Sequence, residues 1–413
     1  MKVLFVSREF PPDPRSDGVG SYVASIAPAL AARGHDVHVL CCLANQDNVD
    51  YGFEGVQVHR RKEISIRGIW RLGRLFPKTV EALQAGFSTF SAYRRLGVCF
   101  DVIEYPDIAA EGWLFALLRF APLVAHLHTP LALYRLINQM ALTPDIKGAS
   151  LLERFAVRRA HMVTSPSRLL VTTLKNTGWL PEVEPQIIPH PIDWLRWNNT
   201  RPVQETSPTV LFMARLERNK APELLVEAMA LIRKSLPEAK ALFIGATSNC
   251  HNGTPYLEWL RTTNRDLTAC EFVGHVSRDR LADFLSTSRV VVIPSWFESY
   301  SMTAIEAMVC GRPIVVTRTS GVSELIEQTG TGRVIPPGDS TALADALMPF
   351  LRDPQHAGMI GEAGRATVRQ HLAPDKIAAQ REMVYQAAID IWKGKGGLAV
   401  SYGSLIIPLD RGS

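Results

Sequence analysis

The stretch that decides the fold spans residues 289–316 and reads RVVVIPSWFESYSMTAIEAMVCGRPIVV. The β-branched run after Arg289 predicts a buried strand over 289–293. A helix is predicted over 303–308, and Gly311 and Pro313 end it before a second apolar run at 313–316. A strand, a helix and another strand in this order predict a parallel βαβ unit.

The same alternation extends in both directions along the chain. Further strands are predicted at 3–6, 37–40, 56–58, 102–103, 123–127, 210–213 and 241–244, with helices at 21–33 and 221–235. The sequence therefore predicts an α/β fold with two doubly wound domains, whose ligand site lies between them at the carboxyl ends of the strands.

The predicted domain boundaries follow from composition. Residues 1–193 form the first domain, and 210–374 form the second. The polar, proline-containing segment 194–209 is expected to be a linker. An amphipathic helix at 375–393 is expected to pack back on the first domain, and the glycine-rich residues 394–413 are expected to form a flexible tail.

Composition excludes several classes of protein. Of the 413 residues, 46% are hydrophobic and 21% are charged, which is typical of globular domains and not of disordered, collagen-like or coiled-coil chains. The net charge of +5 comes from 45 basic and 40 acidic residues, without the strong excess expected of a nucleic-acid partner. The six cysteines form no C-x-x-C pair, so we expect reduced thiols in a cytosolic protein and no zinc site.

No segment predicts membrane insertion. The apolar start at residues 1–6 is too short for a signal peptide and suits a buried strand. The longest nearly apolar stretch, 113–125, contains Arg119 and Pro122 and is shorter than the roughly 20 residues that a spanning helix needs.

Residues 289–316 contain two glutamates that are candidate functional residues. Glu298 would precede the predicted helix and Glu306 would lie inside it. The backbone N–H groups from Tyr300 to Thr303 would then point out of the helix N-terminus, which favours an anion such as a diphosphate. The alternative is that Glu306 is a solvated helix charge and Glu298 only complements the helix dipole.

Further motifs accompany this stretch along nearly the whole chain. They are SREFPP at 7–12, GVG at 18–20, LAARGHDV at 30–37, HTP at 128–130, SPS at 165–167, IPHPID at 188–193 and FVGHV at 272–276. Together with the two glutamates and the AMVCGRPIV that follows, they resemble the retaining GT-B glycosyltransferases of family 4, in the glycogen-synthase-like superfamily. The resemblance implies two Rossmann-like domains that face an interdomain cleft.

The resemblance implies a basic pair for the donor. Arg215 and Lys220, in ARLERNK at 214–220, match the family's pair and would neutralise the donor diphosphate. Fixed cations in a dry cleft stabilise a departing diphosphate. The alternative from the residues alone is a surface pair beside a turn.

The resemblance implies further donor contacts. Glu306 would bind the nucleotide ribose, Glu298 the donor-sugar hydroxyls, and His128 the region of the sugar's primary hydroxyl. The peptide at Val276 would contact the base. Backbone amides at Ser301, Met302 and Thr303 would help to hold the diphosphate.

His126 is a neighbouring candidate for the role of His128. In a strand it would point to the opposite face from His128. For either residue the alternative is a core histidine bonded to the backbone.

Three positions depart from the family pattern. Gly18 and Gly20 lie where the family has a glycine turn that contacts the ligand, but Asp17 replaces the first glycine. Asp tolerates left-handed backbone geometry, and its carboxylate would there meet an acceptor hydroxyl or amine. Ser301 and Ser320 also stand where glycine is usual.

No metal or other cofactor is expected. The chain has no D-x-D motif of the kind that holds a donor through a divalent cation. Arg215 and Lys220 would supply the positive charge instead.

Two charged features bear on the acceptor. Glu104 and Asp107, at the end of a predicted strand, would bind a cationic or polyhydroxylated acceptor, unless they are ordinary loop charges. Basic residues spaced 4, 3 and 4 apart predict one stripe of a helix, preceded by RRK at 60–62; they are Arg67, Arg71, Arg74 and Lys78. This region from Arg60 to Lys78 predicts either peripheral contact with an anionic membrane at the inner face or a solvated basic surface.

The sequence as a whole predicts a cytosolic retaining hexosyltransferase. It would move a sugar from a UDP or GDP donor to a hydroxyl of a small-molecule or saccharide acceptor, by front-face attack and without metal. The alternatives are a sugar-nucleotide epimerase or hydrolase on the same fold, and a non-catalytic nucleotide-sugar-binding or membrane-docked protein.

Overall fold

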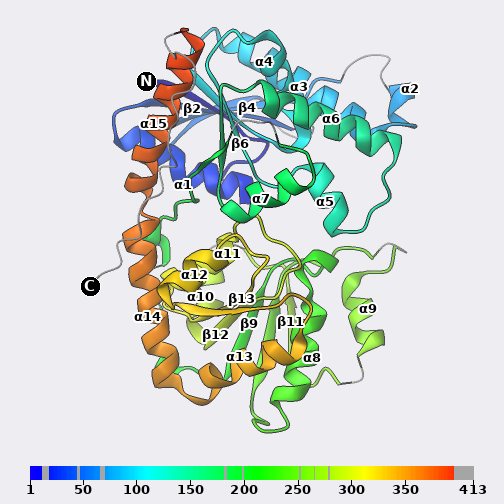
Figure 1. The fold of residues 1–413 in the computed structure, drawn as a ribbon, viewed down its shortest axis with the longest axis vertical. Coiled ribbons are helices and arrows are strands. Elements are labelled where there is room, and N and C mark those ends of the chain that lie inside the picture. The colour runs from blue at the N-terminus through cyan, green and yellow to red at the C-terminus, as the bar shows by residue number, and fades with distance from the viewer. Residues whose placement is uncertain are drawn as a thin grey trace. The chain divides into compact units, whose positions relative to one another are not determined.

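The computed structural model describes residues 1–11, 18–43, 47–65, 70–180, 184–197, 200–250, 253–264, 266–277 and 280–394. The chain divides into two compact units (Figure 1). Unit 1 is Met1–Pro191 together with the chain from Pro374 onward, and unit 2 is Ile192–Ala373. Each unit is built around its own largely parallel sheet, which confirms the predicted α/β class.

The described part of unit 1 has an eight-stranded sheet in the order β3-β4-β2-β1-β5-β6-β7-β8. The strands are β1 (Lys2–Val6), β2 (Asp36–Leu43), β3 (Val49–Phe53), β4 (Val56–Lys62), β5 (Val102–Pro106), β6 (Leu123–His126), β7 (Met162–Ser165) and β8 (Gln186–Ile187). Only the edge pair β3 and β4 is antiparallel. The strand order reverses between β1 and β5, so their carboxyl ends form a switch point of the kind that binds ligands.

Helices cover the sheet of unit 1. They are α1 (Gly18–Ala32), α2 (Trp70–Gly73), α3 (Pro77–Leu96), α4 (Trp113–Leu118), α5 (Leu131–Ile137), α6 (Pro144–Arg159), α7 (Arg168–Asn176) and α15 (Pro374–Trp392), with the 3-10 turn η1 (Ile108–Ala110). The α6 helix begins where the Thr143 hydroxyl accepts the N–H of Ile146, with Pro144 in the first turn. The α15 helix packs against α1 and adds Ile377 and Val384 to the core of unit 1.

In unit 2 the described residues form a six-stranded parallel sheet in the order β11-β10-β9-β12-β13-β14. The strands are β9 (Thr209–Met213), β10 (Lys240–Ile244), β11 (Cys270–Gly274), β12 (Val290–Ile293), β13 (Ile314–Thr317) and β14 (Gly332–Ile335). This is the Rossmann order, and its switch point lies between β9 and β12. The loops that carry the sequence-predicted donor residues follow these two strands.

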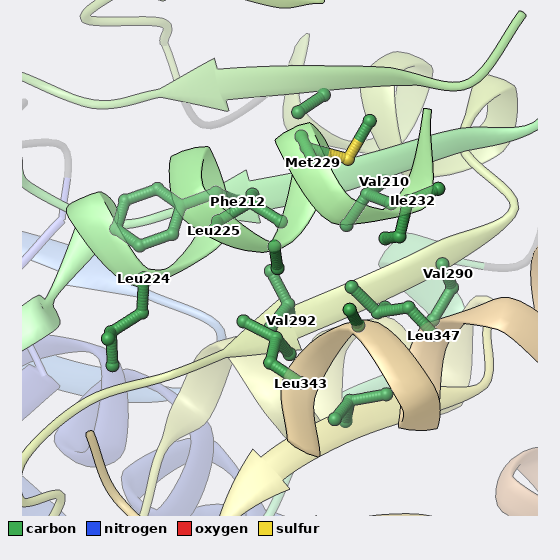
Figure 2. Packing of buried hydrophobic residues seen from close by; sticks show 14 of the residues in the cluster. Val210, Phe212, Leu224, Leu225, Met229, Ile232, Val290, Val292, Leu343 and Leu347 are labelled. Atoms are coloured by element: carbon green, nitrogen blue, oxygen red, sulfur yellow. The ribbon is translucent and has the colours of Figure 1, made fainter. Parts of the chain in front are cut away.

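The helices of unit 2 are α8 (Pro222–Ile232), α9 (Tyr256–Thr263), α10 (Leu281–Thr287), α11 (Met302–Val309), α12 (Ser323–Thr329), α13 (Ser340–Arg352) and α14 (Pro354–His371), with 3-10 turns η2 (Trp194–Trp197), η3 (Val203–Glu205) and η4 (Arg218–Lys220). Side chains alternate across β9. Val210 and Phe212 pack under α8 and α13 (Figure 2), and Leu211 and Met213 pack with α11 on the other face. Both faces of the sheet are therefore buried.

The segment expected as a linker lies within unit 2 in the structure. Trp197 is buried in the same apolar cluster as Leu211 and Ile305, and the Thr200 hydroxyl donates to the carbonyl of Cys310 at 3.1 Å. A polar residue of the segment predicted to be a linker, Thr200, thus forms a hydrogen bond with the end of α11. Beyond Gly394, the expected tail is outside the described residues.

The predicted basic stripe is not one helix. The α2 helix ends at Gly73 and α3 begins at Pro77, because proline starts a helix but cannot continue one. Arg67 and the side chain of Arg71 lie outside what the structure describes. Lys78 pairs with Glu81 at 3.0 Å in the first turn of α3.

The basic residues that precede this stripe lie on β4. Arg60 donates to the carbonyl of Phe10 at 2.8 Å and lies over the ring of Tyr51. Arg61 pairs with Asp50 at 2.7 Å. Arg60 and Arg61 therefore hold the edge of the sheet. Among the described residues, no helix combines the length and the hydropathy that crossing a bilayer requires.

Candidate functional site

Asn219 joins the two loops that follow the switch-point strands of unit 2. Its side-chain amide donates to the carbonyl of Phe297 at 3.0 Å, and its side-chain carbonyl accepts the N–H of Phe297 at 3.2 Å. Its backbone carbonyl accepts the N–H of Trp296 at 2.8 Å. The sequence analysis missed this residue, although its position directly before Lys220 is a usable signal.

The joined loops bring Lys220 and Glu298 together. Lys220 Nζ lies 2.6 Å from Glu298 Oε1, and the Ser295 hydroxyl donates to the same oxygen at 2.7 Å. Both charged side chains remain partly exposed, at 20% and 15%. A fixed cation and a carboxylate thus lie together on the loops that follow β9 and β12.

The backbone of Glu298 is fixed by the loop after β13. Its N–H donates to the carbonyl of Thr319 at 3.0 Å, and its carbonyl accepts the N–H of Gly321 at 2.9 Å. Ser320, which stands at a usual glycine position, is fully buried and donates its hydroxyl to the carbonyl of Tyr300 at 3.4 Å. The departure from glycine is therefore accommodated.

The loop after β12 ends in the N-terminus of α11. Ser301 has φ 94° and ψ 91°, a conformation that suits glycine, and its hydroxyl accepts the N–H of Ala304 at 3.4 Å. The Thr303 hydroxyl donates to the carbonyl of Met213 at 3.2 Å and fixes the helix against the end of β9. The first-turn N–H groups, including those of Met302 and Thr303, have no partner within the helix, so this end is suited to an anion.

The other predicted donor residues of unit 2 differ in exposure. Arg215 is 60% exposed at the side chain and lies 3.3 Å from Glu217. Glu306 is buried within α11, and Val276 is half-buried against the apolar cluster around that helix. Burial raises the pKa of the Tyr300 hydroxyl above its ordinary value, so this side chain is neutral and serves the core.

In unit 1, His128 lies directly beyond β6 and is buried. Its backbone N–H donates to Asp107 Oδ1 at 2.9 Å. Burial and then the charge of Arg381 lower the pKa of His128 to about 3, so the ring is neutral at neutral pH. Gly18 and Gly20 lie in the first turn of α1, and Asp17 lies outside the described residues.

His126 does not point away from His128, contrary to the sequence prediction. The two ring centroids are 4.8 Å apart, because β6 ends at His126 and strand alternation stops there. Arg381 lies 3.1 Å from His126 Nδ1, the Thr164 hydroxyl lies 2.8 Å from the same nitrogen, and His126 Nε2 lies 3.0 Å from His190 Nε2. The alternative of a core histidine describes His126.

The three histidines also raise the question of a metal. Nitrogen atoms of His126, His128 and His190 lie within 4.8 Å of one another. The Arg381 guanidinium beside His126 opposes a second cation at this place, and it already uses one of the imidazole acceptors. The donor set fits a hydrogen-bond network better than it fits a metal ion.

Glu104 has a structural role in the core of unit 1, and not the acceptor-binding role that the sequence predicted. Its carboxylate accepts the hydroxyls of Tyr22 at 2.7 Å and Tyr385 at 2.8 Å, and it lies 3.3 Å from Arg381 NH1. All four residues are buried. The prediction failed because two of these partners come from α15, about 280 residues later in the chain.

Asp107 is buried at the end of β5 and is not an exposed loop charge. Burial raises its pKa to about 7, and within the described residues no group donates to its Oδ2. Glu153 of α6 lies close enough for its own pKa to be raised by burial and by Asp107. A pocket of about 220 Å³ adjoins them, lined in part by Glu153, Lys78, Thr129 and Tyr134.

Comparison with known proteins agrees with this geometry. Residues 16–194 match the family model "Glycosyltransferase Family 4", and residues 196–367 match "Glycosyl transferases group 1". A glycogen synthase of Mycobacterium tuberculosis is 28% identical over 411 residues, which cover 94% of this chain and 95% of the relative. A D-inositol 3-phosphate glycosyltransferase of Arthrobacter sp. is 26% identical over 90% of each chain.

Solved structures share the fold. Sucrose-phosphate synthase from Thermosynechococcus elongatus has a TM-score of 0.68 and 20% identity, covering 93% of this chain and 98% of its own. HepE of Anabaena, solved with UDP-glucose, has the same TM-score and identity over 94% of this chain and all of its own. The protein is thus a glycosyltransferase with the GT-B fold. It belongs to the family 4 glycosyltransferases.

Proposed function

We propose that this family 4 enzyme is a retaining hexosyltransferase with a UDP- or GDP-linked sugar as its donor. The acceptor is a hydroxyl group of a small molecule or saccharide. The near-full-length similarity to a glycogen synthase and to a D-inositol 3-phosphate glycosyltransferase supports this class of acceptor. The UDP-glucose complex of HepE supports a UDP donor.

The observation that carries the proposal is the Lys220–Glu298 pair beside the N-terminus of α11. Lys220 and the first-turn N–H groups supply positive potential at one place, with Arg215 on the same loop. A donor diphosphate is the natural ligand for such a site. Glu298 then contacts the donor-sugar hydroxyls, Glu306 the ribose and the Val276 peptide the base.

The proposed transfer step needs no nucleophile from the protein. The acceptor oxygen forms a bond to the anomeric carbon from the face that the leaving group occupies, as the bond to the diphosphate oxygen breaks. The hydroxyl proton passes to that departing oxygen, and the products are a glycoside and a nucleoside diphosphate. Lys220 stabilises the charge that develops on the diphosphate, which is the main contribution expected of a preorganised cation.

For the acceptor we propose the pocket of unit 1 beside β5 and β6. The ring of Tyr134 and the hydroxyl of Thr129 line it and suit a sugar or cyclitol ring. Glu104 is engaged elsewhere and takes no part.

The transfer requires no metal in this proposal. The positive charge comes from Lys220, Arg215 and the helix terminus, so a chelator such as EDTA leaves the rate unchanged. Loss of activity in EDTA and recovery with magnesium or manganese would contradict this part.

The test is radiolabelled transfer from a panel of UDP- and GDP-hexoses. Lys220→Ala should lower kcat/KM by about 100- to 1000-fold, as loss of one preorganised charge contact does. Lys240→Ala is the matched control, because this exposed lysine starts β10 beside Thr209 and so lies at the amino ends of the strands, away from the loops after β9 and β12. Full activity of Lys220→Ala, or donor consumption that yields only free sugar or an epimer, would refute the proposed transfer.

A further inference from the structure

A fully buried arginine of α15 reaches into the sheet of unit 1. The Nη1 of Arg381 donates to the Thr164 hydroxyl at 2.8 Å and to Glu104 Oε2 at 3.3 Å. Its guanidinium lies over the Tyr22 ring, 5.1 Å from the centroid, and 3.1 Å from His126 Nδ1. A buried ion pair is weak evidence of stability, because taking two charges out of water offsets their attraction, so this pair calls for a functional explanation.

Three histidines pack around this pair and form what we call the histidine cluster. They are His126, His128 and His190, with ring centroids between 4.8 and 5.6 Å apart. The Tyr22 ring contacts all three, at centroid distances from 4.5 to 5.8 Å. Burial is the main cause that lowers the pKa of each of these rings, and the charge of Arg381 lowers it further, so the histidine cluster is uncharged at neutral pH.

The two tyrosines that hold Glu104 add no charge. Burial raises the pKa of the hydroxyls of Tyr22 and Tyr385, which therefore stay protonated and donate to Glu104 at 2.7 and 2.8 Å. Together with the histidine cluster, these groups carry one positive charge on Arg381 and one negative charge on Glu104. The two charges cancel, and removal of either one would leave the other unbalanced beside the histidine cluster.

A further carboxyl group lies close to His128 from the segment after β5. Asp107 accepts the backbone N–H of His128 at 2.9 Å, and burial raises its pKa to about 7. Glu153 of α6 is close to Asp107, and burial and this neighbour raise its pKa as well. Both carboxyls are unchanged in the variants considered below, so a comparison of variant with wild type at each pH cancels their titration.

We propose that Arg381 is a positioning residue for sugar transfer, because its charge balances Glu104 and keeps His128 as an uncharged ring beside the donor sugar. This inference rests on the proposed function and on the contact between His128 and the donor sugar that the family resemblance implies. An uncharged imidazole can both donate and accept a hydrogen bond to sugar hydroxyls. The anomeric carbon gains positive charge as its bond to the diphosphate breaks, and an imidazolium beside the sugar opposes that charge. Without Arg381, the unbalanced Glu104 draws a proton onto the histidine cluster.

The test compares kcat/KM for transfer at about pH 8 and at about pH 5.5, in the full chain. Arg381→Gln removes the charge and keeps a hydrogen-bond donor. Between these two pH values it should lose about tenfold more activity than the wild type, because a histidine with the ordinary pKa of about 6.5 is about nine-tenths protonated at the lower pH. Glu104→Gln breaks the same ion pair but leaves the positive charge, so its pH ratio should equal that of the wild type although its fold is destabilised.

Two further variants separate charge from folding. Arg289→Gln alters a buried arginine of unit 2 that donates to the carbonyls of Thr206 and Leu351, and its pH ratio should equal that of the wild type. Arg381→Gln/Glu104→Gln removes both charges and should also keep the wild-type ratio, which tests the charge balance even where Arg381→Gln alone does not fold. A wild-type ratio in folded Arg381→Gln, or an acid loss shared with Glu104→Gln or with the double variant, would overturn the proposal, because the role of Arg381 is then structural.

Nuclear magnetic resonance of the ring nitrogens reports histidine protonation in the same proteins without any substrate. The histidine cluster should stay uncharged from about pH 8 to about pH 5.5 in the wild type, and one of its rings should titrate near pH 6.5 in Arg381→Gln. Titration of the cluster in the wild type over this range would contradict the proposal whether or not transfer is found. Absence of transfer in the wild type with an uncharged cluster would instead refute the proposed function.

Discussion

Glu104 and Glu298 both lie near the carboxyl end of a strand beside a switch point, yet their surroundings differ. Glu104 is still within β5, and two tyrosines and Arg381 use both of its oxygens. Glu298 lies five residues beyond β12, on a loop, and keeps part of its surface exposed beside Lys220. The distance beyond the strand end therefore separates a carboxylate that holds the fold from one that can meet a ligand.

The largest expected effect tests this difference between Glu104 and Glu298 directly. Glu104→Gln should lower the free energy of unfolding by about 3–5 kcal/mol, because it leaves Arg381 buried without its charge partner. Glu298→Gln, at the more exposed pair, should cost only about 1 kcal/mol while lowering transfer. Urea unfolding of both variants measures the difference, and equal losses of stability would show that the two sites do not differ in this way.

A second prediction concerns the pH dependence of unit 1. In the unfolded chain Asp107 ionises at the ordinary pKa of aspartate, whereas burial holds its proton up to about pH 7 in the folded chain. Its contribution to stability is complete below the ordinary pKa and is lost as the pH rises through about 7. Asp107→Asn should therefore gain stability relative to the wild type between pH 4 and pH 8, by up to about 4 kcal/mol.

The control for this prediction is Asp50→Asn, whose effect on stability should depend on pH in the opposite direction. Arg61 and His59 lower the pKa of Asp50, so its contribution to stability is present at neutral pH and is lost as the pH falls. Asp50→Asn should therefore be least stable relative to the wild type at neutral pH. Parallel urea titrations at each pH measure both variants, and a flat Asp107→Asn difference would mean that Asp107 is ionised in the folded chain.

Sequence reasoning located unit 2 better than unit 1. The apolar runs predicted β9 and β12, and the motif positions placed Lys220 and Glu298 on the loops that the structure joins. Both depend on local patterns that a single sequence displays. The polar core of unit 1 depends on Arg381, which no local pattern connects to β5, and so Glu104 was given the wrong role.

A third prediction tests whether Asn219 positions Lys220 and Glu298 by joining the two loops. Asn219→Ala removes both side-chain bonds to Phe297, which should cost about 1–3 kcal/mol of stability. Displacement of Lys220 and Glu298 should lower kcat about 10- to 100-fold, with KM for the acceptor unchanged. Asn264→Ala, which also removes a side-chain bond to backbone but at the end of α9, should leave kcat unchanged. A fall in stability without a change in kcat would make Asn219 merely structural.

The smallest expected effect is at Ser301. Glycine relieves the positive φ angle, and the lost cap bond to Ala304 is long, so Ser301→Gly should stabilise the protein by about 0.5–1 kcal/mol. Thermal unfolding measures the change. A lower melting temperature would show that the serine hydroxyl contributes more than the strain of its backbone costs.

The central claim is that the loops after β9 and β12 form a nucleoside-diphosphate site that depends on Lys220. Isothermal titration of UDP and GDP into the wild type and Lys220→Ala, in the presence of EDTA, tests it most directly. We predict that the wild type binds at least one of the two nucleotides and that Lys220→Ala weakens this binding by about tenfold or more, as expected when a charged contact is lost. Equal affinity of both proteins, or binding that appears only when a divalent cation is added, would contradict the claim.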